Sequence, residues 1–284
     1  MSELTKRVLF ALAAIPVVAG AIWFGDAPLA ILLSIASALG AWEYGRLAIA
    51  AGARPMQRTG IVLSALLPLA MHAARLGIWV PPLGLVALLP PALLTLALWR
   101  RGSAAKPIES VATTLFGAWY VGGMLSFAYA LRYHRFAVGA LSGTLLVMMP
   151  MVLTWLNDSG ALVFGKAFGK RKLMPTVSPG KTVAGAVGAL AVCIASTWIY
   201  VTLLLRPYAG LGLTIWGTLL FGTAMSAAAQ IGDLVESMLK RQAGVKDSSA
   251  MIPGHGGVLD RVDSLLFTIP LGYVLLDLLL RVGA

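Results

Sequence analysis

The sequence predicts an all-α polytopic integral membrane protein with about nine transmembrane helices. Hydrophobic residues make up 59% of the 284 residues and charged residues only 12%, a balance far from that of soluble globular domains. Apolar runs long enough to cross a bilayer recur along the whole sequence. The alternating pattern of a β-barrel is absent, so helices must satisfy the backbone hydrogen bonds in lipid.

The expected spans follow the apolar runs in chain order. They cover residues 8–24, 27–49, 59–75, 78–99, 110–131, 140–160, 182–205, 211–232 and 264–282. The first run could pass for a signal peptide because cations precede its apolar core, but the many runs that follow indicate an uncleaved helix. Two proline pairs, at 81–82 and 90–91, predict that the fourth span is kinked or begins late.

The distribution of lysine and arginine predicts the orientation. With the N-terminus in the cytoplasm, most of the 22 lysines and arginines fall on the cytoplasmic side, as the positive-inside rule requires, and the C-terminus lies outside. The two richest polar loops, 157–181 and 233–263, then share the cytoplasmic side. The formal net charge of +11 is spread over loops, which favours anionic lipid and anionic substrate over nucleic acid as partners. The single cysteine, Cys193, excludes an intrachain disulfide.

The densest charge in the chain lies in residues 237–264. This segment carries the cations Lys240, Arg241, Lys246 and Arg261 and the carboxylates Asp247, Asp260 and Asp263. Glycines on both sides of His255 allow a tight turn there. Carboxylates, cations and a glycine turn together suit the binding of a divalent metal with polyphosphate. The plainer alternative is a solvated cytoplasmic loop, but such a loop requires cations and not three aspartates.

A second polar segment covers residues 157–185. Asn157 and Asp158 close an apolar run, and a glycine-rich basic stretch follows them. Ser178 to Thr182 then opens the next span, where free N–H groups, a positive dipole end and Lys181 suit phosphate. The spacing is not that of a Walker A loop, since the upstream glycine is misplaced and no strand precedes it. A basic juxtamembrane loop before a capped helix is the alternative.

Both segments resemble the phosphatidate cytidylyltransferase (CDP-diacylglycerol synthase) family. The matched signature consists of Ser237, Lys240, Arg241, Lys246, Asp247, Pro253, Gly254, His255, Gly256, Gly257, Asp260, Arg261 and Asp263. Residues 157–185 are similar to a second family pattern, with one departure at Ala184, where many members have glutamate. Residues 1–150 match the family only in being hydrophobic helices, apart from a weak match at Trp42 and Glu43.

The resemblance implies transfer of the cytidylyl group of CTP to phosphatidic acid, giving CDP-diacylglycerol and pyrophosphate. It implies catalytic roles for Asp233, Asp260, Lys240, Arg241, Lys246, Arg261 and His255, phosphate binding by Ser178, Lys181, Thr182, Asp158, Lys240 and Arg261, and Mg²⁺ binding by Asp233, Asp260 and Asp263. Binding of a second cation stays open. The alternative role for His255, which we favour over direct catalysis, is hydrogen bonding within the loop. The lipid phosphate is already a nucleophile near neutral pH, so the reaction demands no strong general base.

The same resemblance also implies a domain organisation and an oligomeric state. Residues 1–150 would form a transmembrane scaffold with a role in dimerisation, and residues 151–284 would form the catalytic domain. The protein would be a homodimer in the inner (plasma) membrane, with its active site facing the cytoplasm.

Two other classes of function remain open from the sequence. A transporter or channel is compatible with many spans and intramembrane charge, but its site would lie near the midplane and not at one face. A CTP-using lipid kinase or a transferase that consumes a CDP-lipid is the second alternative. Release of pyrophosphate, and not of CDP or CMP, would distinguish the expected reaction from both enzymes.

Overall fold

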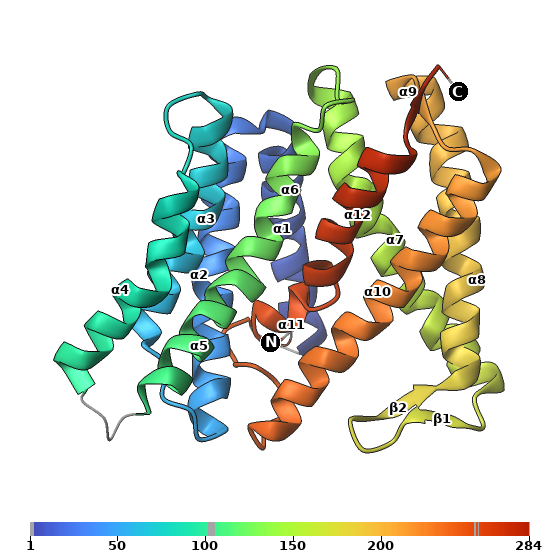
Figure 1. Cartoon of the computed structure of the whole chain (residues 1–284). Coiled ribbons are helices and arrows are strands. Elements are labelled where there is room, and N and C mark those ends of the chain that lie inside the picture. The colour runs from blue at the N-terminus through green and yellow to red at the C-terminus, as the bar shows by residue number, and fades with distance from the viewer. Residues whose placement is uncertain (1–2, 102–105, 253, 255, 284) are drawn as a thin grey trace. The chain divides into compact units, whose positions relative to one another are not determined.

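The computed structural model describes residues 3–101, 106–252, 254 and 256–283, and it is almost entirely helical (Figure 1). Its contacts divide the chain into two compact units. The first unit comprises Met1–Tyr129 and Leu239–Arg261, and the second comprises Ala130–Met238 and Val262–Ala284. This division does not follow the predicted boundary at residue 150, because the signature segment belongs with the N-terminal helices. Whether that boundary separates scaffold from catalysis stays a prediction.

The first unit is built from the N-terminal helices. They are α1 (Glu3–Phe24), α2 (Asp26–Ala50), α3 (Gln57–Arg75), α4 (Leu83–Arg101), α5 (Pro107–Ala118), the π-helical turn η2 (Trp119–Gly123) and most of α6 (Met124–Arg132). α2 packs along α3, and the hydroxyl of Ser64 on α3 donates to the carbonyl of Ser37 on α2 at 3.0 Å. α4 begins only at Leu83, after the first proline pair, as the sequence predicted.

The second unit is organised around a pair of long helices. Its elements are α7 (Gly139–Phe168), β1 (Lys172–Met174), β2 (Ser178–Thr182), α8 (Val183–Tyr200), the π-helical turn η3 (Val201–Leu205), α9 (Arg206–Ala209), β3 (Leu211–Gly212), α10 (Ile215–Gln242), α11 (Leu259–Val262), α12 (Leu265–Leu279) and β4 (Arg281–Val282). α10 ends in the first unit, and α11 lies at the boundary between the units. α7 and α8 lie side by side and are joined by the antiparallel β1–β2 hairpin (Figure 1).

The structure corrects the expected boundaries of both polar loops. α7 does not end near residue 160 but continues to Phe168, so Asn157 and Asp158 lie on a helix. α8 can approach this extension because Gly188 has no side chain, and a Cβ there would collide with Phe164. Ser178 to Thr182 forms strand β2 and not the first turn of a helix; α8 follows it, and the Thr182 side chain caps α8 by accepting from the N–H of Gly185. The second loop is likewise shorter, because α10 runs on to Gln242.

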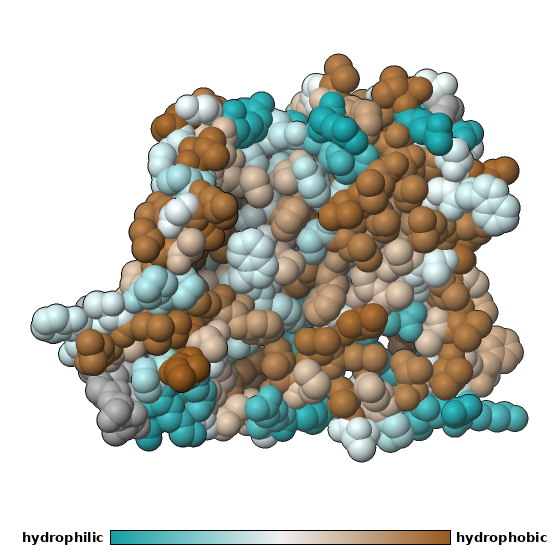
Figure 2. All heavy atoms as spheres, in the orientation of Figure 1, coloured by the Kyte–Doolittle hydropathy of each residue, from teal (hydrophilic) through white to brown (hydrophobic). Residues whose placement is uncertain are grey.

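Six helical segments of the described residues are long and apolar enough to cross a membrane. They are Asp26–Ala50, Pro107–Arg132, Gly139–Phe168, Val183–Ala209, Ile215–Gln242 and Leu259–Leu279. Figure 2 shows hydrophobic residues covering much of the visible helical surface of the second unit, where Leu220 and Leu278 are exposed. An apolar helical exterior of this kind is typical of a protein that lies in lipid. The prediction of a helical membrane protein is confirmed; nine spans and the orientation stay predictions.

Candidate active site

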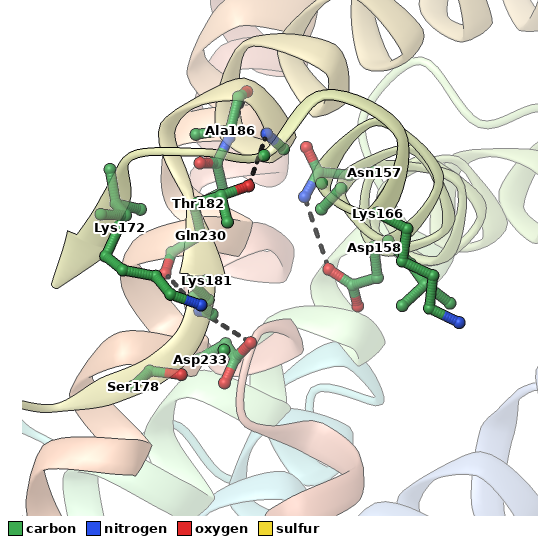
Figure 3. Close-up of a pocket in the computed structure, with 17 residues that line it drawn as sticks. Asn157, Asp158, Lys166, Lys172, Ser178, Lys181, Thr182, Ala186, Gln230 and Asp233 are labelled. Atoms are coloured by element: carbon green, nitrogen blue, oxygen red, sulfur yellow. Dashed lines mark hydrogen bonds and ion pairs between the residues drawn. The ribbon is translucent and has the colours of Figure 1, made fainter. Parts of the chain in front are cut away.

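A cavity of about 600 Å³ opens in the second unit, and polar side chains from α7, the β1–β2 hairpin and α10 line it (Figure 3). Its polar lining consists of Asn157, Asp158 and Lys166 from α7, Lys172, Ser178, Lys181 and Thr182 from the hairpin, and Gln230 and Asp233 from α10. This volume is in the range of protein sites for small molecules and cofactors. In Figure 3 the hairpin lysines Lys172 and Lys181 lie toward Gln230 and Asp233, whereas Lys166 extends away from them.

Lys181 and Asp233 form an ion pair at this cavity. The Nζ atom of Lys181 lies 2.7 Å from Oδ2 of Asp233 and also donates to the backbone carbonyl of Gln230 at 3.5 Å. The other oxygen of Asp233 receives a weaker bond from the Ser237 hydroxyl at 3.4 Å. Lys181 comes from β2, whose register against β1 pairs Thr182 with Lys172. The structure thus brings Asp158, Ser178, Lys181, Thr182 and Asp233 around one cavity, while their chemical roles stay predictions.

A chain of buried polar groups lies behind the carboxylates. The hydroxyl of Ser226 donates to Oδ1 of the fully buried Asn157 at 2.7 Å, and Nδ2 of Asn157 donates to Asp158 at 3.4 Å. Nε2 of Gln230 donates to Ser226 at 3.0 Å and to the carbonyl of Ala186 at 3.3 Å. These bonds fix the orientation of the side chains that line the cavity.

The sequence analysis did not single out Ser226 or Gln230. Their spacing relative to Asp233 was the available signal, because the three residues recur at four and three positions in an otherwise apolar run. Such residues share one face of a helix.

The first unit contains a second ion pair, between Lys240 at the end of α10 and Asp260 on α11. Nζ of Lys240 lies 2.6 Å from Oδ1 of Asp260, and both side chains are almost fully buried. Oδ2 of Asp260 accepts three further bonds: from the N–H of Ser248 at 2.9 Å, from the Ser248 hydroxyl at 2.8 Å and from the N–H of Gly257 at 2.8 Å. Asp260 therefore also organises the loop that precedes it.

The remaining signature residues are divided between the two units. Arg241, Lys246 and Arg261 are exposed, and Nη1 of Arg241 donates to the carbonyl of Val245 at 3.2 Å. Asp263 belongs to the second unit, where its carboxylate accepts from the N–H of Ser264 at 2.6 Å. Gly232, the neighbour of Asp233 in the chain, packs against the carbonyl of Asp263. His255 lies outside the described residues.

The donor chemistry of the two aspartates fits Mg²⁺. Oδ2 of Asp233 and Oδ1 of Asp260 each face a lysine ammonium, so each already has a cation as its partner. Anionic oxygens are the ligands that Mg²⁺ prefers, and an ion bound there would take the place of the ammonium. The described residues contain no group of three or more His, Cys, Asp or Glu side chains that could hold a metal. Asp233 and Asp260 belong to different units, and their meeting at one ion stays a prediction.

Comparison with known proteins identifies the family. The model of the Cytidylyltransferase family matches residues 5–279. The chain belongs to this family. It is 42% identical over 151 residues to the phosphatidate cytidylyltransferase of Haemophilus influenzae, an alignment that covers 53% of this chain and 51% of that protein. It is 34% identical over 217 residues to the phosphatidate cytidylyltransferase of Staphylococcus epidermidis, covering 76% of this chain and 78% of that protein. The predicted family membership is confirmed.

Proposed function

We infer that this protein is a nucleotidyltransferase of phospholipid biosynthesis, which transfers the cytidylyl group of CTP to phosphatidic acid. The products are CDP-diacylglycerol and pyrophosphate. The observation that carries this conclusion is the family match over residues 5–279, together with relatives that are named phosphatidate cytidylyltransferase. The cavity of the second unit supports it, because it combines an adequate volume with side chains suited to phosphate.

The cavity is the site that we propose for the triphosphate of CTP. Lys172 and Lys181 supply positive charge from the hairpin, and the hydroxyls of Ser178 and Thr182 lie on the same strand. Charge-assisted hydrogen bonds of this kind are the strong ones in phosphate recognition. Lys240, Arg241, Lys246 and Arg261 stay the proposed contacts of the signature segment with phosphate, on the resemblance alone.

The reaction requires positioning and charge neutralisation more than covalent chemistry from the protein. An oxygen of the lipid phosphate attacks the α-phosphorus of CTP, and the bond from that phosphorus to the oxygen shared with the β-phosphate breaks. Pyrophosphate leaves with the electron pair. Lysine ammonium groups next to the phosphates stabilise the negative charge that builds up on the leaving group. No side chain has to remove a proton, because the attacking phosphate oxygen is already anionic.

Mg²⁺ is part of the proposal. Asp233, Asp260 and Asp263 are the residues that would hold it, and a second cation stays open. When bound, the ion would neutralise phosphate charge and align the reacting groups. Direct catalysis by His255 also stays a proposal.

The finer membrane arrangement is proposed on the charge bias and the helix positions. Each of the nine expected spans overlaps a described helix, and α1 and α4 include shorter apolar helices, at Leu12–Phe24 and Leu83–Trp99. We propose nine spans, a cytoplasmic N-terminus, an external C-terminus and a homodimer in the inner membrane, with the active site facing the cytoplasm and no nucleic-acid partner. Reporter fusions at the two termini test the orientation, and two reporters active on the same side would contradict it.

The decisive experiment uses purified protein with labelled CTP and phosphatidic acid, with and without Mg²⁺. We expect a labelled lipid product on chromatography, pyrophosphate in equal amount, and loss of both without the ion. Release of CDP would indicate a lipid kinase, and release of CMP a transferase that consumes a CDP-lipid. Flux of substrate into liposomes without consumption of CTP would favour a transporter.

A further inference from the structure

A buried glutamate on α2 meets the signature segment in the first unit. Glu43 has an exposed fraction of 0%, although it lies on an apolar helix. Burial of a carboxylate is costly unless hydrogen bonds replace its water. The hydrogen-bond donors to its carboxylate lie at positions 248–249 and 258–259, so this segment makes up much of the environment of Glu43.

Four donors surround the carboxylate, two at each oxygen. Oε1 accepts from the Ser249 hydroxyl at 2.6 Å and from the N–H of Val258 at 3.0 Å. Oε2 accepts from the Ser248 hydroxyl at 3.0 Å and from the N–H of Leu259 at 2.7 Å. Glu43 thus ties the two ends of the loop, at 248–249 and 258–259, to one point on α2.

The same loop carries the second carboxylate, Asp260. The hydroxyl of Ser248 lies between the two acids, 3.0 Å from Glu43 and 2.8 Å from Asp260, and its single proton serves both. The N–H of Gly257 turns to Asp260, while the next two N–H groups turn to Glu43. The position of Asp260 therefore depends on a loop that Glu43 holds.

Gly257 shows how closely the loop backbone approaches Glu43. A Cβ atom at this position would collide with both carboxylate oxygens of Glu43 and with the Ser248 hydroxyl. A side chain here would push the loop away from α2, so the close contact itself requires glycine.

We propose that Glu43 is a positioning residue for cytidylyl transfer: it holds residues 248–249 and 258–259 in the conformation that places Asp260 and Lys240. The inference rests on the proposed function, which gives Asp260 and Lys240 their chemical roles. Glu43 acts through the loop and does not touch the reacting atoms. A displacement of about 1 Å at a reacting group can cost about 10²-fold in rate.

The test compares E43Q with E109Q. Both variants replace glutamate by glutamine in the first unit, but Glu109 lies half-exposed on α5 and pairs with Lys106 at 3.3 Å. Glutamine at 43 keeps one acceptor and turns an NH₂ group toward donors of the loop. We expect kcat of E43Q to fall about 10²-fold with KM for CTP within about threefold of the wild-type value, and E109Q to match the wild type.

Hydrogen–deuterium exchange gives the readout that a general loss of stability would not imitate. In E43Q the amides of Val258 and Leu259 should lose protection, while those of α3 and α5 keep it. S249A, which removes one donor of the four, should give a smaller change of the same kind. E43D, which keeps the charge on a shorter side chain, should recover part of the lost kcat.

Two results would overturn the proposal: wild-type kcat in E43Q, or loss of protection throughout the first unit together with loss of activity. If E43Q does not fold, S249A with unchanged kcat and unchanged exchange at Val258 overturns it equally. Failure of the proposed function is distinguishable, because the wild-type protein would then form no CDP-lipid, whereas the exchange experiment would still report whether Glu43 holds the loop.

Discussion

The two units each contain a lysine–aspartate pair of nearly the same geometry in very different surroundings. Lys181 and Asp233 lie 2.7 Å apart, with side chains 23% and 39% exposed, at the edge of an open cavity. Lys240 and Asp260 lie 2.6 Å apart, but are only 12% and 5% exposed, and Asp260 also binds two N–H groups and a hydroxyl of its own loop. A lysine–aspartate pair thus borders an open cavity in the second unit and holds a backbone loop in the first.

The largest effect should come from D260N, compared with D233N. Both remove a carboxylate that pairs with lysine, and we expect each to lower Mg²⁺-dependent turnover by at least about 10³-fold while the protein stays in the membrane. Only D260N should also expose the amides of Ser248 and Gly257 to hydrogen exchange. Its NH₂ group would replace either the oxygen that accepts from these amides or the oxygen that accepts from Lys240. Full activity in D260N would contradict its assigned role, and a loosened loop in D233N would break the comparison.

A smaller effect is expected from K181M, which keeps an unbranched side chain one atom shorter but removes its charge. The cavity loses the ammonium that faces Asp233, so we expect KM for CTP to rise about 10-fold, corresponding to one charge-assisted hydrogen bond. K106M, at an exposed pair with Glu109, provides the matched control and should leave KM unchanged. Initial rates at varied CTP measure both; an unchanged KM in K181M would argue against the cavity as the triphosphate site.

The buried chain behind the cavity should affect stability more than turnover. S226A removes the donor to Oδ1 of the buried Asn157, and we expect the free energy of unfolding to fall by about 1–2 kcal/mol. S142A is a suitable control, since the buried Ser142 hydroxyl has no hydrogen-bond partner among the described residues. Thermal unfolding in detergent measures both variants. Equal melting temperatures for S226A and S142A would show that the chain contributes little.

The smallest effect should come from D277N, at an ion pair of the second unit that is not part of the cavity lining. Arg135 lies 2.7 Å from Asp277, with side chains 62% and 36% exposed. Such a pair contributes at most about 1 kcal/mol to stability, and we expect turnover within about threefold of the wild-type rate. Loss of turnover in D277N would contradict the distinction that we draw between Asp277 and the two aspartates with proposed catalytic roles.

The sequence predicted the helices better than their ends. Each apolar run that hydropathy marked overlaps a helix among the described residues, since an apolar run needs no partner to be recognised. Hydropathy ended α7 too early, near residue 160, because the polar residues Asn157 and Asp158 were taken to mark the membrane surface. The helix continues because the chain packs against α8 and turns those side chains toward a cavity.

The candidate site was predicted as residue types and not as an arrangement. Charged signature residues could be assigned a role from the sequence, but Ser226 and Gln230 could not, because their spacing to Asp233 indicates a shared helix face and not the hydrogen bonds that they make. Glu43 was only a weak match to the family pattern, and the sequence assigned it no role, because its donor Val258 lies 215 positions away in the chain.

Composition and the order of apolar runs determined by themselves that this chain is a helical membrane protein, because hydrophobicity is a property of each residue. Motif spacing was enough to predict the family, which the comparisons then confirmed. Only the tertiary structure decided which aspartate borders a cavity and which holds a loop, and that a glutamate on α2 reaches the signature segment. Those distinctions depend on hydrogen bonds between residues far apart in the chain, and folding alone brings such residues together.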